Sequence, residues 1–146
     1  MKQQKCNTVD LSTIKVRRSD EDTMAMLFDR QIQLLLKIEE RKPQGFKVLV
    51  NKADVPDSLR IKLMIDMIGC LHNELEELRD ALPWKGWKDY SGYSLKKEMP
   101  EIKYEIIDLL HFVLNLAIIS GMKPVEVLQI YISKNEQNKD RQKKGY

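Results

Sequence analysis

The segment from Ile106 to Ile119 limits the possible folds more than any other, because a helix built from it is apolar on almost every side. A helix of that kind is expected in the centre of a domain. Pro100 fits the first turn of this helix, and Gly121 marks its end. A chain of 146 residues has the length of one domain, so we expect the other helices to pack around this one.

Helical spacing of apolar residues continues through most of the remaining chain. The stretch Phe46–Val50 is expected to be a short strand or part of a loop. Glycine (6) and proline (5) are scarce, which argues against a turn-rich β-sandwich. The sequence therefore predicts an all-α, four-helix-bundle-like domain over residues 19–146, preceded by an N-terminal arm of residues 1–18. The predicted helices cover roughly residues 21–41, 56–82, 100–121 and 124 onward.

Charge is distributed unevenly along the chain. Residues 134–146 carry a net +3 and residues 1–18 a net +4, so the middle of the chain carries −4. An acidic centre between basic ends suits a ligand that combines a metal cation with a polyphosphate. The alternative is that the basic ends are solvated tails or bind nucleic acid weakly.

Nothing in the sequence indicates a membrane or an oxidising compartment. The N-terminus is polar, unlike a signal peptide, and no apolar run is long enough to span a bilayer. Cys6 and Cys70 show neither metal-ligand spacing nor a disulfide framework, and a bridge between them has little support. Cys70 is expected in the core. We therefore expect a cytoplasmic protein without a membrane partner.

Two pairs of acidic residues lie on the predicted helices at a spacing of three. Glu74 and Glu77 share one face of the second helix, and Glu105 and Asp108 share one face of the third. The second pair interrupts the most apolar helix, where an uncompensated charge is costly. A divalent cation between the pairs offsets their repulsion. Oxygen ligands without a histidine or cysteine cluster favour Mg²⁺, or Mn²⁺, over Zn²⁺.

Two interpretations of these acidic pairs that involve no metal stay open. Most pairs at this spacing are solvated helix faces, as we expect for Glu76 and Asp80. Alternatively, Arg79 or a lysine neutralises the pair on the buried helix in a structural ion pair.

The helix face that carries Glu105 and Asp108 continues, one turn at a time, to Phe112 and Asn115. An aromatic ring can stack on a nucleobase, and an amide can hydrogen-bond to the edge of that base. Core packing is the commoner role for a phenylalanine at such a position. His111 is expected to be a structural histidine and not a ligand.

The two acidic pairs resemble those of the all-α nucleoside triphosphate pyrophosphohydrolases, a superfamily that includes the MazG-like enzymes and the dimeric dUTPases. Three further segments resemble the dimeric dUTPase branch: a Trp-Lys-x-Trp-Lys loop at residues 84–88, an Asp-x-x-His-Phe run at 108–112, and the tail at 131–146. The tail is the most specific, since it reads Tyr-Ile-Ser-Lys-Asn-x-x-Asn-x-x-Arg-Gln-x-x-Gly-Tyr. The resemblance covers roughly residues 24–36 and 70–146.

This resemblance implies an enzyme that uses Mg²⁺ to cleave a nucleoside triphosphate into its monophosphate and pyrophosphate. It implies that Glu74, Glu77, Glu105 and Asp108 bind the metal, and that Glu74 orients and deprotonates the attacking water. The tail residues that it implies for substrate binding, the first four on one helical face, are Tyr131, Lys134, Asn138, Arg141 and Tyr146.

For the base, the resemblance implies that the first-helix glutamine contacts uracil, that the aromatic residue of the third helix stacks on it, and that a tryptophan of the 84–88 loop closes over it. The further substrate-binding residues are then Gln31, Trp84, Lys88, Phe112 and Asn115. Leu35 departs from the Asn or Asp that family members often carry there. We expect dUTP as substrate, with dCTP or a purine triphosphate as the alternative.

The sequence thus predicts a dUTP pyrophosphohydrolase that forms a homodimer with its sites near the subunit interface. An alternative from another class is a helical interaction module that kept the fold and lost the activity, with its basic tail on phosphate backbones. We do not expect nucleic acid as a partner, because all four acids and the tail residues occur together.

Overall fold

The computed structural model describes residues 23–51 and 54–145, and this part of the chain contains five α-helices and no strand. The prediction of an all-α fold is therefore confirmed. The arm predicted for residues 1–18 lies outside the described residues, as does Cys6. The helices are α1 (Thr23–Arg41), α2 (Phe46–Val50), α3 (Asp57–Asp80), α4 (Leu95–Ile119) and α5 (Pro124–Lys143).

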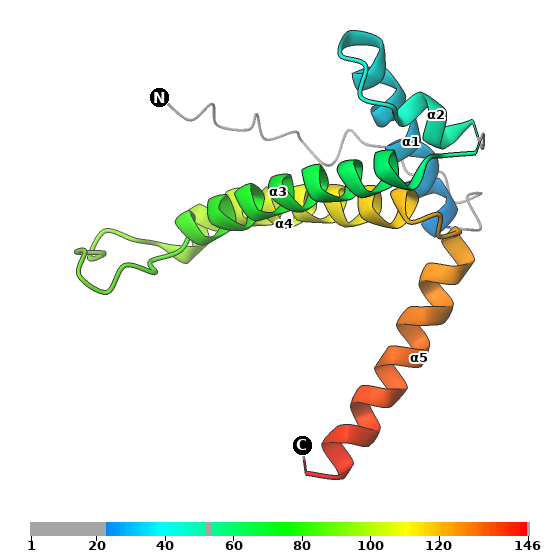
Figure 1. The fold of residues 1–146 in the computed structure, drawn as a ribbon. Coiled ribbons are helices and arrows are strands. Elements are labelled where there is room, and N and C mark those ends of the chain that lie inside the picture. The colour runs from blue at the N-terminus through cyan, green and yellow to red at the C-terminus, as the bar shows by residue number, and fades with distance from the viewer. Residues whose placement is uncertain (1–22, 52–53, 146) are drawn as a thin grey trace.

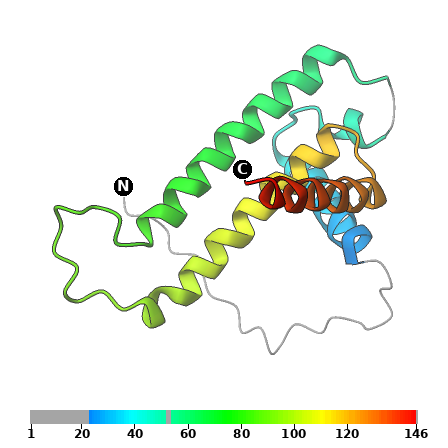
Figure 2. The same cartoon turned by 90° about the horizontal axis from the view of Figure 1, so that it is seen from below.

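α3 and α4 form a long antiparallel pair on which the rest of the fold is arranged (Figure 1). α1 packs across one end of this pair, with α2 beside it, whereas the loop that joins α3 to α4 lies at the opposite end. α5 starts near the end that α1 covers and runs away from the pair, with a bend of 108° between α4 and α5 (Figures 1 and 2).

A side chain of α3 fixes the turn between α4 and α5. The Arg60 guanidinium of α3 donates a hydrogen bond to the carbonyl oxygen of Ile119, the last residue of α4. A cation at this place also interacts favourably with the negative end of the helix dipole. Gly121 then adopts a φ of 83°, a left-handed conformation in which a glycine is strain-free, and turns the chain toward α5.

The hydrophobic core lies where α1, α2, α3 and α4 meet. Each of these four helices contributes one side chain that is fully buried: Leu35, Phe46, Leu63 and Ile119. On α1 the buried residues Phe28, Gln31 and Leu35 recur one turn apart, which is the spacing of a helix with one face toward the core. The packing that holds the domain together is thus concentrated at one end of the α3–α4 pair.

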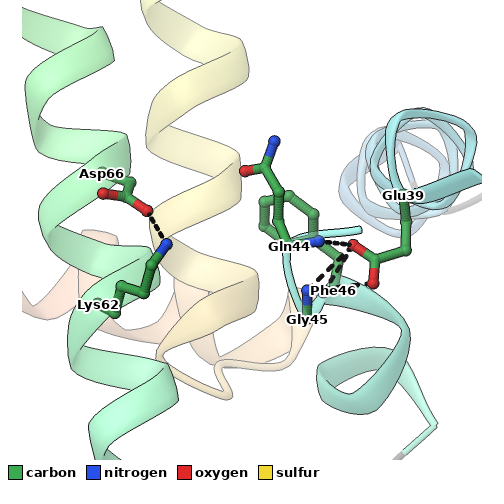
Figure 3. A network of polar contacts seen from close by, with 6 residues as sticks. All are labelled: Glu39, Gln44, Gly45, Phe46, Lys62 and Asp66. Atoms are coloured by element: carbon green, nitrogen blue, oxygen red, sulfur yellow. Dashed lines mark hydrogen bonds and ion pairs between the residues drawn. The ribbon is translucent and has the colours of Figure 1, made fainter. Parts of the chain in front are cut away.

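The prediction of a strand or loop for Phe46–Val50 is wrong, because these residues form α2. The carboxylate of Glu39 on α1 accepts hydrogen bonds from the backbone N–H groups of Gln44, Gly45 and Phe46, at 2.7, 3.1 and 3.2 Å (Figure 3). The N–H groups of Gly45, the N-cap, and Phe46, the first residue of α2, are donors that a helix leaves unpaired at its start. A contact from another helix, which local periodicity does not reveal, therefore starts this short helix.

α4 begins at Leu95 and not at Pro100 as predicted. The carbonyl of Ser94 accepts hydrogen bonds from the backbone N–H groups of Lys97 and Glu98, at 2.9 and 3.1 Å, and starts the helix one turn earlier. Proline lacks only its own N–H, so Pro100 removes a single hydrogen bond close to the helix start.

α4 is not buried on every side, which corrects the expectation for Ile106–Ile119. Leu114, Ile118 and Ile119 lie in the core, whereas Ile106 and Val113 are each 49% exposed. The difference arises because α1 covers only one end and one side of the α3–α4 pair (Figure 1). An apolar face therefore remains on the outside of the single chain.

Two further expectations concern the thiol and the membrane. Cys70 is half-buried with a free thiol, so it is less enclosed than predicted. No single helix of the described residues is long and apolar enough to cross a membrane, and α4 and α5 reach that composition only when they are taken together across their bend.

The capping of α2 leads to a testable prediction. Glu39→Ala should lower the free energy of unfolding by about 1–2 kcal/mol, because three backbone donors lose their acceptor. The matched control is Glu40→Ala, since Glu40 is exposed and pairs with Lys37 on the surface at 2.7 Å. It should change stability by less than about 0.5 kcal/mol. Urea unfolding measures both values, and equal losses would contradict the capping role.

Candidate active site

Three carboxylates from α3 and α4 come together along the helix pair. The carboxylate oxygens of Glu74, Glu105 and Asp108 lie within 4.8 Å of one another, and we name these residues the carboxylate triad. Glu74 belongs to α3, whereas the other two lie one turn apart on α4. Glu77, the fourth predicted metal ligand, is exposed and outside the triad, although its charge acts on Glu74 and Glu105.

The triad is an electrostatically unfavourable arrangement. Glu105 is only 6% exposed. Burial, reinforced by the negative charges of Glu77, Asp108, Glu74 and Glu101, raises the pKa of Glu105 to about 6. Burial and the charges of Glu77 and Asp108 likewise raise the pKa of Glu74. Both pKa shifts reflect burial and the proximity of like charges. A bound cation relieves the repulsion between these charges.

No basic side chain neutralises the triad in the part of the chain that the structure describes, where no salt bridge includes any of its members. Arg79, one alternative partner expected from the sequence, instead pairs with Glu76 and lies over the ring of Trp84. Three close oxygen donors, with excess negative charge and no thiol or imidazole among them, fit a hard divalent cation such as Mg²⁺ or Mn²⁺.

A chain of hydrogen bonds among four side chains, which we name the amide network, joins α1, α3 and α4. His111 Nδ1 lies 2.6 Å from Gln31 Oε1, and Gln31 Nε2 donates to Asn115 Oδ1 at 2.7 Å. Asn115 Nδ2 in turn donates to the sulfur of Met67 at 3.4 Å. Gln31 and Asn115 are 3% and 5% exposed. The structure thus brings together two of the predicted base-contacting residues.

Sequence reasoning missed Met67 and gave His111 a structural role only. Spacing holds a signal for both, because Met67 precedes Glu74 by seven residues and His111 follows Asp108 by three, so each pair shares a helix face. Phe112, predicted to stack on a base, is half-buried and packs against the core in the single chain.

Trp84 is held by its own neighbours at the end of α3. Its indole N–H donates to Asp80 at 2.7 Å. The guanidinium of Arg79 lies 3.9 Å and the ammonium of Lys85 lies 4.7 Å from the ring centroid. Trp87 meets Trp84 edge-on, with the ring centroids 6.0 Å apart. These contacts make the loop a compact aromatic and basic unit.

This loop lies at the end of the α3–α4 pair opposite α1 (Figure 1). Along α3, Met67 and Asp80 are about 20 Å apart at 1.5 Å of rise per residue. Glu74 lies between them, so the triad separates the loop from the amide network. Within one chain, the structure therefore does not bring Trp84 or Lys88 to Gln31.

The predicted substrate-binding tail forms the helix α5, as its spacing indicated. Tyr131, Lys134, Asn138 and Arg141 are all exposed on it, and Tyr146 lies outside the described residues. Because α5 runs away from α3 and α4, the structure does not bring these residues to the triad of the same chain (Figure 1).

Comparison with known proteins adds independent findings. Residues 23–123 match the dUTPase family. The dCTP pyrophosphatase of Enterobacteria phage T4 is 30% identical over 152 residues, which cover 87% of this chain and 84% of that protein. The dCTP pyrophosphatase of Enterobacteria phage LZ5 is 31% identical over 146 residues, covering 86% and 83%. No solved structure matches. The matched region contains the carboxylate triad and the amide network, and this chain belongs to the all-α dUTPase family.

Proposed function

We propose that the protein is a Mg²⁺-dependent nucleotide pyrophosphatase that hydrolyses dUTP to dUMP and pyrophosphate and so keeps dUTP out of the nucleotide pool. The observation that carries the proposal is the carboxylate triad, with three oxygens within 4.8 Å of one another. Family membership and the printed activity of the two phage relatives support the class of reaction. Gln31, next to Asn115, supports a pyrimidine base.

In this proposal Glu74, Glu105 and Asp108 hold the metal, with Glu77 one helical turn from Glu74. A bound Mg²⁺ would neutralise negative charge on the phosphates. Glu74 accepts a proton from the attacking water, because it is the member of the carboxylate triad that α3 brings to Glu105 and Asp108. The water oxygen bonds to the α-phosphorus. The bond from that phosphorus to the α,β-bridging oxygen breaks, and the monophosphate and pyrophosphate separate.

A homodimer completes the site in this proposal. On α3, Ile61, Ile65 and Ile68 are 56%, 63% and 47% exposed and recur at the spacing of one helix face. Large apolar stripes of this kind on a small domain mark a surface that another chain covers. A second copy covers them and brings the exposed α5 of one subunit toward the triad of the other, which its own α5 does not approach.

Two other functions have a specific observation in their favour. The relatives are named dCTP pyrophosphatases, which favours dCTP for the same reaction. The exposed, basic end of α5 favours a module without activity that binds phosphate backbones. Both are separated from the first proposal by the activity measurement below.

Glu74→Gln should lower Mg²⁺-dependent turnover by at least about 100-fold, because it removes the proton acceptor. Glu76→Gln is the matched control, since Glu76 is exposed, pairs with Arg79 and lies outside the triad. Pyrophosphate release is measured separately from dUTP, dTTP, dCTP, dATP and dGTP, with Mg²⁺ or with a chelator. Turnover confined to dCTP would make dCTP the substrate in place of dUTP. The absence of turnover with every nucleotide would favour the module without activity that binds phosphate backbones.

Ile65→Glu should convert the dimer into monomers, because a charge then lies in the apolar interface. Val48→Glu on α2 is the control, since Val48 is also partly exposed but lies outside the stripe on α3. Sedimentation velocity gives the mass of both variants. A wild-type protein that sediments as a monomer at all concentrations contradicts the dimer.

Glu105→Gln should raise the melting temperature of the metal-free protein near neutral pH by roughly 2–5 °C. The pKa of Glu105 in the folded chain is above its usual 4.5, so the folded state binds the proton more tightly than the unfolded state. Stability therefore falls as pH rises from about 4.5 through 6, and the variant loses the part of this dependence that Glu105 contributes.

Added Mg²⁺ should reverse this order and stabilise the wild type more than the variant, because the cation binds only the folded site. Thermal melts across pH with chelator or Mg²⁺ give the comparison, with Glu76→Gln as control. A lower metal-free melting temperature for Glu105→Gln at neutral pH argues against repulsion within the triad.

A further inference from the structure

We propose that Gly69 is a positioning residue for the metal ligands on α3, because it lets the half of the helix that carries Glu74 and Glu77 bend toward α4 when a cation binds. This inference rests on the proposed function, in which the carboxylate triad holds a divalent cation. Gly69 touches neither the cation nor the nucleotide, and it acts only through the two glutamates.

Gly69 is a costly residue at its place in the fold. It lies near the middle of α3, where glycine is less stable than alanine because it loses more backbone freedom on folding. Its φ is not positive, unlike that of Gly45 and Gly121. A Cβ atom added at Gly69 would meet no described atom within 4 Å outside its own helix turn. Neither the backbone conformation nor the packing of the described residues therefore requires a glycine here.

Gly69 divides α3 into a half that the core holds and a half that it does not. The two buried residues of α3, Leu63 and Met67, both precede it. Beyond Gly69 no residue of α3 is buried, and α1 and α2 pack at the other end of the helix pair (Figure 1). This second half carries Glu74 and Glu77 and leads into the loop. A segment with so few buried contacts has a low local stability and moves readily.

One bound ion needs a tighter arrangement of the carboxylates. Ligand oxygens at 2.0–2.1 Å from Mg²⁺ are about 3 Å apart when adjacent and about 4 Å apart when opposite. The triad oxygens, spread over up to 4.8 Å, therefore have to draw closer. Glu77 is exposed and outside the triad, so it has farther to move before it can bind. Glu74 and Glu77 both follow Gly69, and a bend at that residue moves them together.

The required bend is small. Gly69 precedes Glu74 by about 7.5 Å and Glu77 by about 12 Å of helix, at 1.5 Å per residue. A bend of about 10–15° at Gly69 therefore moves the first glutamate by about 1.5 Å and the second by about 2.5 Å. Leu63 and Met67 stay in the core during this movement. Bends in helices form at few residue types, and glycine has the widest range of backbone angles among them.

Close approach of a second chain is the other explanation for an exposed glycine at this position. Gly69 follows Ile65 and Ile68 of the apolar stripe on α3, which a second copy covers in the proposed dimer. The two explanations predict different results for Gly69→Ala. At a contact between chains, the added methyl group weakens the dimer. At a bend, it leaves the dimer intact and stiffens the helix.

Three variants of the full chain test the bend. Gly69→Ala stiffens α3 without a clash, and Gly69→Ser should have an intermediate effect, because serine lies between glycine and alanine in helix propensity. Asp66→Ala is the matched control, since it also raises helix propensity but lies in the half that the core holds. It breaks only the exposed pair with Lys62, at 2.6 Å, and removes a charge about 12 Å of helix from Glu74.

The melting temperature of the metal-free protein and its affinity for Mn²⁺ are measured side by side. Electron paramagnetic resonance follows Mn²⁺, with Mg²⁺ as competitor. Gly69→Ala should raise the melting temperature by about 2–4 °C and weaken the affinity for both ions about fivefold, because a stiffer helix opposes the bend. The metal affinity of Asp66→Ala should stay within about twofold of wild type. A glycine with a merely structural role does not combine higher stability with weaker metal binding.

Hydrogen exchange gives a readout without metal. In the wild type, the backbone amides of residues 70–80 should exchange faster than those of residues 60–67, and Gly69→Ala should slow the first group about fivefold. Equal exchange in the two halves of the wild-type helix overturns the proposal.

Two further results overturn the role of Gly69. One is a metal affinity that is the same in Gly69→Ala and wild type. The other is a lower mass of Gly69→Ala in sedimentation velocity with an unchanged metal affinity per chain, which favours contact with a second copy.

Failure of the proposed function is recognised separately. A wild type that binds neither ion has no metal site, and the inference falls with it. A wild type that binds Mn²⁺ but hydrolyses no nucleotide refutes the proposed activity, and the metal affinities of the variants still decide the role of Gly69.

Discussion

Repulsion among the carboxylates of Glu74, Glu105 and Asp108 acts between α3 and α4, and the two helices stay together because they are held at both ends. At one end the core packs Leu63 of α3 against α1, α2 and α4. At the other end the Tyr93 hydroxyl donates to the carbonyl oxygen of Ala81 at 3.2 Å and ties the loop to the end of α3. The fold thus holds three mutually repelling carboxylates between two regions of contact, and a bound cation would relieve this repulsion.

The polar groups of α4 follow one another in a fixed order along one helix face. Asn115 lies where α1 covers α4, Asp108 and Glu105 follow in the direction of the loop, and the basic and aromatic loop lies beyond them. The base and the phosphates of a nucleotide are separated in the same way. In the proposed function, one pair of helices thus binds both parts of the nucleotide without a separate domain for either.

Much of this arrangement could be predicted from the sequence. The 3.6-residue period predicted the extent of α1 and α3 and the start of α5, and the spacing of three placed Glu105 and Asp108 on one helix face, because both depend only on local helix geometry. The meeting of Glu74 with that pair, and the position of Glu77 outside the triad, depend on how α3 packs against α4. α2 could not be predicted in this way, since it depends on Glu39, which caps it from another helix. The exposed side of α4 was also missed, because an apolar residue does not reveal whether its own chain or a second one covers it.

Because α5 extends from the bend after α4, a small rotation at this bend displaces the far end of α5. Arg60 holds the end of α4 at Ile119, Gly121 follows two residues later, and α5 then runs for 20 residues, or about 30 Å. A rotation of only about 10° at Gly121 moves the far end of such a rod by about 5 Å, which is roughly its own pitch. Small adjustments of the α3–α4 pair are therefore amplified at Lys134, Asn138 and Arg141, in proportion to their distance from the turn.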